Sequence, residues 1–411
     1  MIRTRWTVCA SLVLTCLLLA MSLAAWADGP LLIEVNEHQL EFGRSLSFHL
    51  TASSTAKIDS AILIYRTTDN KGMTIERLDF EPAFRLELSY EVDLSHRPLK
   101  PFVEIEYWWT VEDAAGNKLT TDPRRFYYQD KRFEQGRSLA GRQVVVHWYD
   151  GDAAFGSLAL NTAEQAVDRI RESVFPTLTL SEPLHLYIYA GQDDLLPALP
   201  AAGGEGVIGQ AYPELRLAVM SIPPGPESSS AMRRLIPHEL THLLLYELMN
   251  SAYEHLPPWL SEGLAVASEQ VADPDEALVL EQALWNDQLL PLDLLCQSFP
   301  YGNEQSHLAY AQSASLVGFI QENYGYSAID ALLAAYGDGL SCQGGVRRAL
   351  GISLSRLESE WRESLGTRPP GEAFLKQAAP WLLLVFLSLP LFVLLAQPLL
   401  AYRQGQQSRF P

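Results

Sequence analysis

The sequence predicts an α+β protein, and three observations on its 411 residues indicate this class. Apolar and polar residues alternate through the first hundred residues after an apolar leader, as they do in antiparallel sheet. Short strand-like runs and then long helical patterns follow. Hydrophobic residues make up 48% of the chain, which is enough to form folded cores in two or three domains.

The N-terminal segment 1–27 has the pattern of a secretory signal peptide. Arg3 and Arg5 precede an apolar run, and Ala25-Trp26-Ala27 provides a small-x-small cleavage site. The alternative is an uncleaved N-terminal anchor.

Residues 28–135 are predicted to form a β-sandwich of the immunoglobulin or fibronectin kind. Strict alternation runs through Phe84–Leu94 and Val103–Glu112, and turn residues lie at Asp69–Gly72 and Asp113–Asn117. No cysteine pair links two sheets, so the domain is at most immunoglobulin-like.

Residues 136–368 are predicted to form a second, α+β domain. Strands are expected at Val144–Trp148, Leu184–Ala190 and Leu215–Ile222, and a helix at Thr162–Phe175 that begins with a Thr162/Gln165 capping box. From Ala231 the pattern is mainly helical. The last helix carries an apolar stripe of Leu354, Leu357, Trp361 and Leu365.

The C-terminal region is predicted to cross a membrane once. After a linker at 369–380, residues 381–402 form an apolar segment in which Trp381–Leu400 contains no charge, and about 20 helical residues span a bilayer core. Arg403 and Arg409 make the tail 403–411 positive and therefore cytoplasmic. A buried core helix is the alternative, but such a helix rarely lacks polar residues on every face.

Charge and cysteine content narrow the partners of the outer portion. The formal net charge of −19 argues against nucleic acid, which requires a basic surface. Cys296 and Cys342 are the two cysteines that follow the leader, and an oxidising compartment favours a disulfide between them. The alternative is two buried thiols too far apart to bridge.

The segment around His238-Glu-Leu-Thr-His242 carries the chemistry. Two histidines four apart on a helix project from one face, so both imidazoles can reach one Zn²⁺, while Glu239 can act as a general base. Pro237 predicts that this helix starts or kinks there. Pro257 and Pro258 begin a second helix that carries Glu262, and this carboxylate is expected to complete a His-His-Glu metal site.

These two motifs, His-Glu-x-x-His followed by Trp259-Leu-x-Glu-Gly-x-Ala265, resemble those of the gluzincin metallopeptidases, specifically the bacterial peptidase MA-like domain. The resemblance covers about residues 140–366 and implies a zincin fold, one zinc ion held by His238, His242 and Glu262, and Glu239 as base. It also nominates Tyr310, in Ala309–Ala314, to stabilise the oxyanion; Tyr301 and His307 remain alternatives.

The chain departs from aminopeptidase N-type relatives in two ways. The gap between the second histidine and the glutamate is one residue longer, and the Gly-x-Met-Glu-Asn segment that holds a free amino terminus is absent. Both departures favour an endopeptidase. Substrate is expected to lie along an exposed strand, for which Leu215–Ile222 is the candidate.

We therefore expect a membrane-anchored zinc metallopeptidase that hydrolyses peptide bonds with a zinc-bound water and Glu239 as general base. Its substrate would be a peptide or protein. Its β-sandwich would either engage a protein partner or space and dock the peptidase domain. The alternative is a catalytically silent, zinc-containing surface binding or scaffold protein.

Overall fold

The computed structural model describes residues 31–68, 72–95, 99–174, 178–199, 207–271, 273–297, 299–300 and 305–366, together with residues 378, 379, 382, 384 and 388. The predicted signal peptide, the cytoplasmic tail and, apart from those five single residues, the linker and the membrane span lie outside this set. Within it, no helix is both long enough and apolar enough to cross a membrane. The described residues divide into two compact units: 31–136 with 192–199, and 137–191 with the residues from 207 onward.

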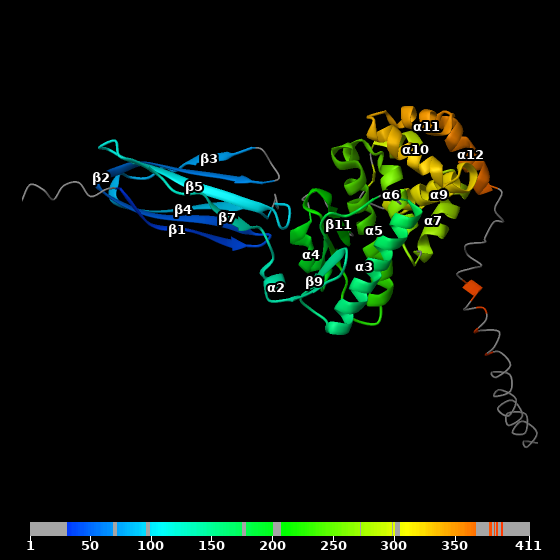
Figure 1. Cartoon of the computed structure of the whole chain (residues 1–411), viewed down its shortest axis with the longest axis horizontal. Helices are drawn as coiled ribbons and strands as arrows, with labels where there is room; N and C mark the ends of the chain where they lie inside the picture. Colours follow the sequence, from blue (N-terminus) through cyan, green and yellow to red (C-terminus); the bar gives the residue numbers. More distant parts are fainter. Residues whose placement is uncertain are drawn as a thin grey trace, which may run out of the picture. The chain divides into compact units, whose positions relative to one another are not determined.

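The first unit is an antiparallel sheet of seven strands, drawn in blue to cyan in Figure 1. Its strands are β1 (Leu32–Glu41), β2 (Ser45–Thr67), β3 (Thr74–Arg77), β4 (Ala83–Asp93), β5 (Glu104–Asp113), β6 (Lys118–Thr120) and β7 (Arg124–Tyr127). The predicted alternation is visible in β5, where every second residue from Ile105 to Val111 is fully buried.

Strand β2 organises this sheet because it is 23 residues long and changes partners along its length. Its first half pairs with β1 and β4, and its second half pairs with β3 and β5. Register shifts between Ser53 and Ser60 separate the two halves. The strands thus form one continuous half-barrel around a core that includes Phe48, Leu63 and Trp109. Antiparallel sheet was predicted correctly, and the immunoglobulin-like or fibronectin-like assignment stays a prediction.

A short segment from later in the chain belongs to this first unit. It contains helix α4 (Gln192–Leu195) and the 3₁₀ turn Leu196–Ala198. Gly43 has a φ of +76°, and a Cβ there would lie 2.3 Å from Cβ of Pro197, so only glycine permits this close approach. Arg132, from the short helix α2 (Lys131–Glu134), forms an ion pair with Asp194. No sequence pattern indicated this return of the chain.

The second unit begins with a five-stranded sheet in the order β11-β12-β10-β9-β8. Its strands are β8 (Arg137–Ala140), β9 (Val144–Trp148), β10 (Leu184–Tyr189), β11 (Gly209–Tyr212) and β12 (Leu217–Ser221). Strands β9, β10 and β12 run parallel, and β8 and β11 pair antiparallel to them at the two edges. Helices α3 (Ala153–Ser173) and α5 (Ser228–Met249) share one hydrophobic core with this sheet.

Helices dominate the remainder of this unit, coloured green to orange in Figure 1. They are α6 (Pro258–Ser268), α7 (Pro274–Trp285), α8 (Leu292–Gln297), α9 (Ser306–Tyr324), α10 (Tyr326–Gly337), α11 (Cys342–Leu350) and α12 (Leu354–Gly366). The predicted apolar stripe of the last helix is confirmed, since all four of its residues are buried in α12.

Two expectations about this unit were wrong. The helix predicted to begin at Thr162 begins nine residues earlier, where the side chain of Asp152 caps it by accepting the N–H of Phe155. Thr162 lies inside the helix and donates to the carbonyl of Leu158. The strand predicted to be exposed, observed as β12, is buried along its whole length between β10 and β11.

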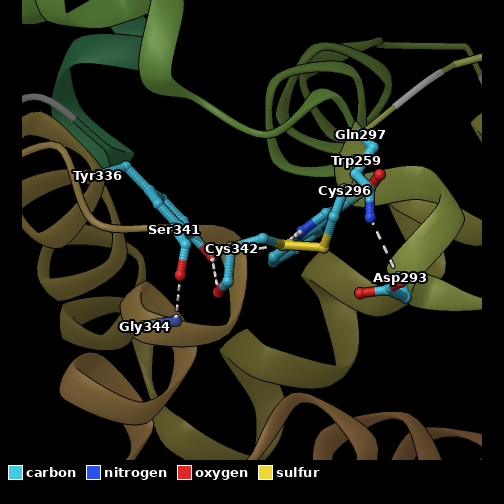
Figure 2. The surroundings of a disulfide bond; sticks show 8 residues. All are labelled: Trp259, Asp293, Cys296, Gln297, Tyr336, Ser341, Cys342 and Gly344. Carbon is cyan, nitrogen blue, oxygen red and sulfur yellow. Dashed lines mark hydrogen bonds between the residues drawn. A yellow bond between two sulfur atoms is a disulfide. The ribbon is translucent and has the colours of Figure 1, made fainter.

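The predicted disulfide between Cys296 and Cys342 is present, and Figure 2 shows its surroundings. It joins α8 to the start of α11, with the two Cα atoms 5.9 Å apart. The indole N–H of Trp259 donates to Cys342 Sγ at 3.4 Å. Because Trp259 is fully buried in α6, the disulfide packs directly against the helix that carries Glu262.

Candidate metal centre

Helix α5 brings three of the predicted site residues together: His238, Glu239 and His242. Of the two outcomes predicted for Pro237, a helix start or a kink, the structure excludes the start, because α5 begins at Ser228 and contains the proline in its interior. A proline has no N–H, so the carbonyl of Arg233 one turn earlier has no partner within the helix. The backbone N–H of Gln270 donates to that carbonyl at 2.9 Å.

This bond joins the two helices of the site. Gln270 lies two residues past the end of α6, so the proline in α5 creates the acceptor that anchors the C-terminal end of α6. Thr241, also in α5, supports the same junction through a hydroxyl that lies 2.9 Å from Ser268 Oγ. Helix α5, which carries the His-Glu-x-x-His motif, therefore also supports α6.

Helix α6 presents Glu262 to the histidines. It begins at Pro258, as the proline pair predicted. A Cβ on Gly263 would lie 2.5 Å from the carbonyl oxygen of Ser313, so glycine is needed for α9 to approach this closely. With α5 and α9 packed against it, α6 keeps the Glu262 side chain 8% exposed.

His238, His242 and Glu262 converge on one point. Their ligand atoms all lie within 4.8 Å of one another, and Oε2 of Glu262 is 3.5 Å from Nε2 of each histidine. Ligands about 2.0 Å from a tetrahedral metal lie roughly 3.3 Å apart, so these donors fit a single ion such as zinc. Among the described residues, this is the group of three or more His, Cys, Asp or Glu side chains that can hold a metal.

Each histidine is held at its other ring nitrogen by a residue that we did not predict. Nδ1 of His238 lies 2.9 Å from Oε1 of Glu269. Nδ1 of His242 lies 3.1 Å from Ser261 Oγ and 3.2 Å from the hydroxyl of Tyr253. These contacts leave both Nε2 atoms directed at Glu262, which is the arrangement that a metal-binding imidazole requires.

Only one of these supporting residues carries a sequence signal. Glu269 follows Glu262 by seven positions, which is close to two helical turns and therefore places both on the same side. Tyr253 lies in the 3₁₀ segment Asn250–His255, whose path no periodic pattern predicts. Ser261 is adjacent to Glu262 but has no distinguishing feature in the sequence.

The charges of the metal-free cluster follow from these contacts. Burial lowers the pKa of His238, but hydrogen bonds to Glu262 and Glu269 outweigh it and raise this pKa to about 10. Burial raises the pKa of Glu262, but the adjacent His242 and His238 hold it well below its usual range. Burial also raises the pKa of Glu239, which makes it a stronger base than an exposed glutamate.

Tyr310 lies beside the cluster on α9. Its ring centroid is 6.0 Å from that of His238 and 4.9 Å from that of Phe299. Burial, together with the nearby carboxylates of Glu262, Glu239 and Glu269, raises the pKa of its phenol, so the hydroxyl keeps its proton and can donate it in a hydrogen bond. Two other residues were predicted as alternatives to Tyr310 for stabilising the oxyanion. His307 is exposed, and Tyr301 lies outside the described residues.

The sequence model of the Peptidase MA superfamily matches residues 162–367, half of the chain. The chain belongs to this superfamily. The match includes α5 and α6, the two helices of the candidate site. Membership suggests a metallopeptidase, and the group of His238, His242 and Glu262 can hold a metal ion.

Other comparisons add little. No curated protein matches the chain. A β-1,3-glucan-binding domain of carbohydrate-binding module family 56 is 15% identical, with 24% of this chain and 99% of that one covered, at a TM-score of 0.16. A polysaccharide deacetylase from Bacillus cereus is 10% identical, with 41% and 54% covered, at a TM-score of 0.18. Likeness at these TM-scores says nothing about the function of this chain.

Proposed function

We propose that this protein is a membrane-anchored, extracytoplasmic zinc endopeptidase. The observation that carries the proposal is the convergence of His238, His242 and Glu262, with buried Glu239 on the same helix as the two histidines. Two neutral imidazoles and one carboxylate leave a position open on a tetrahedral metal, which is the composition of a catalytic zinc site.

In this proposal each side chain of the site has its own role in peptide hydrolysis. When bound here, zinc supplies Lewis-acid polarisation of the scissile carbonyl and of the attacking water. Glu239 accepts a proton from that water and returns it to the leaving amine. The phenol of Tyr310 donates a hydrogen bond to the oxygen on which negative charge develops. Glu269, Ser261 and Tyr253 keep the two imidazoles oriented.

The edge of β11 that faces away from β12 is the surface on which we place the substrate. Strand β11 pairs with β12 on one side and ends the strand order of the described sheet. An extended peptide can add to such an edge through main-chain hydrogen bonds. This replaces β12, the strand expected from the sequence, because β12 has partners on both sides.

Endopeptidase activity is favoured by the lack of a Gly-x-Met-Glu-Asn segment, which in aminopeptidase N-type enzymes holds the free amino terminus. The leader at 1–27 and the apolar segment at 381–402 favour a chain anchored in a membrane with its bulk outside. The disulfide between Cys296 and Cys342 agrees with an oxidising compartment.

The test compares the full-length protein with Glu239→Gln. Zinc content is measured on both. Cleavage is assayed on a library of peptides blocked at both ends, which an aminopeptidase does not accept, and on the same library without the blocking groups. We expect about one zinc per chain in both proteins and cleavage at least 100-fold faster by the wild type. A wild type that holds zinc but cleaves no faster than Glu239→Gln would instead indicate the silent scaffold. Cleavage of only unblocked peptides would indicate an exopeptidase.

A further inference from the structure

Gly209, the first residue of β11, lies against the side chain of Glu239. A Cβ built on Gly209 would lie 2.4 Å from Oε1, 3.1 Å from Cδ and 3.3 Å from Cγ of this glutamate. Real Cβ atoms essentially never come within 3.0 Å of a heavy atom outside their own residue and its two chain neighbours. The carboxylate therefore occupies space that exists only because residue 209 has no side chain.

The backbone at this position does not itself require glycine. Gly209 is absent from the glycines of positive φ and lies in regular antiparallel pairing, opposite Met220. An alanine there can adopt the same φ and ψ. The three nearest atoms to the added methyl group all belong to Glu239, so the contact with this side chain is what excludes it.

The carboxylate has little other room. Glu239 is 5% exposed, and α5, which carries it, is fixed to α6 through the bond from Gln270 to Arg233. A methyl group on residue 209 would push the carboxylate out of its present position without disturbing the fold elsewhere, because a flexible side-chain end yields more easily than backbone.

We propose that Gly209 is a positioning residue for the general base: its bare Cα sets where the Glu239 carboxylate lies relative to the metal centre. This inference rests on the proposed function, since it assigns Glu239 the role of base. Strand β11 then has two roles, because the strand proposed to pair with substrate also positions the carboxylate of Glu239. Misplacing a catalytic group by about 1 Å can slow a reaction roughly 100-fold.

The experiment substitutes Gly209→Ala in the full-length protein and measures zinc content, kcat and a crystal structure. We expect unchanged zinc content, a kcat reduced roughly 100-fold, and a Glu239 carboxylate displaced by about 1 Å. Gly191→Ala is the matched control, because a Cβ there meets no atom within 4 Å and its φ is not positive. This control should retain wild-type kcat.

A second substitution separates crowding from general damage. Glu239→Asp shortens the side chain by one carbon and so removes the clash with the methyl group of Gly209→Ala. The fold reduction in kcat caused by Glu239→Asp should therefore be at least tenfold smaller in the Gly209→Ala background than in the wild type. If Gly209→Ala does not fold, the double variant should recover the fold. Independent, multiplicative effects, or a failed recovery, would overturn the proposal.

The structural measurement also separates this proposal from the proposed function. A carboxylate that keeps its wild-type position in the Gly209→Ala variant overturns the positioning role, whatever the activity. A displaced carboxylate in a protein that hydrolyses nothing confirms the contact and instead defeats the peptidase assignment.

Discussion

At the scale of single residues, Glu269 supports the candidate metal centre through His238. Its Oε1 holds Nδ1 of His238, and its side chain is 8% exposed. A carboxylate in this position fixes the imidazole ring and raises its strength as a ligand.

We predict that Glu269→Ala lowers zinc affinity by about 10- to 100-fold, because His238 loses the partner that orients it. Competition with a chelator of known affinity measures the change. Glu254→Ala, at an exposed position in the connection between the two ligand helices, serves as the control and should bind zinc as the wild type does. Equal zinc affinities in all three proteins would show that His238 does not need a carboxylate partner at Nδ1 to bind the metal.

Glu276 offers a prediction about pH. Burial raises the pKa of this carboxyl to about 7, and the neighbouring Glu269 and Asp273 add to the shift. Below pH 4.5 the group is protonated in the folded and the unfolded chain alike. Between pH 4.5 and 7 only the unfolded chain ionises, so the protein loses stability as pH rises through this window.

Glu276→Gln removes that ionisation. We expect the metal-free variant to unfold at higher denaturant concentration than the metal-free wild type at pH 8, by up to about 3 kcal/mol, and to match it near pH 4. Urea unfolding at both pH values measures the difference. If the free energies of unfolding of the variant and the wild type differed by the same amount at pH 4 and pH 8, packing and not charge would be responsible.

At the scale of elements, the disulfide fixes α8 and α11 around the second ligand helix. It closes a segment 46 residues long that contains α9 and α10, and Trp259 of α6 donates to one of its sulfurs. Closing a loop of this length restricts the unfolded chain and stabilises the folded one by about 4 kcal/mol.

We predict that replacing both Cys296 and Cys342 by alanine lowers the free energy of unfolding by about that amount. Urea unfolding with and without a reductant provides the check: the reductant should destabilise the wild type and leave the variant unchanged. If neither the reductant nor the double substitution changed the free energy of unfolding, a structural role for the disulfide would be contradicted.

The elements also show what sequence patterns can and cannot predict. Strand β9 and the start of α6 were predicted from alternation and from the proline pair, because these signals are local. Strand β11 was missed: it has four residues, includes a glycine, and forms only because β12 offers an edge. Of the alternatives for Pro237, the helix start was wrong, because an interior proline is tolerated when another segment, here Gln270, uses the carbonyl that it frees.

At the scale of the whole molecule, the described residues form two separate hydrophobic cores. The change of period near residue 135 predicted this division, because alternation belongs to sheet and the later pattern to helices. The inclusion of 192–199 in the first unit could not be predicted, since it depends on tertiary contacts such as Gly43 with Pro197.

The candidate site was more predictable than the fold around it. The convergence of His238, His242 and Glu262 could be predicted because metal coordination restricts both residue type and spacing. The residues that hold these side chains and that of Glu239 in place, Tyr253, Ser261, Glu269 and Gly209, satisfy only local packing and hydrogen bonding. Many different residue types can meet such demands, so the sequence alone does not single these positions out.

The disulfide also affects how damage to this protein would be detected. A single cut by a protease anywhere between Cys296 and Cys342 leaves both fragments covalently joined. Such nicked molecules would migrate as intact chains on a non-reducing gel and separate into two bands only after reduction. Preparations judged homogeneous without a reductant can therefore contain molecules already cut on the N-terminal side of Tyr310, with the phenol and the metal ligands on different fragments.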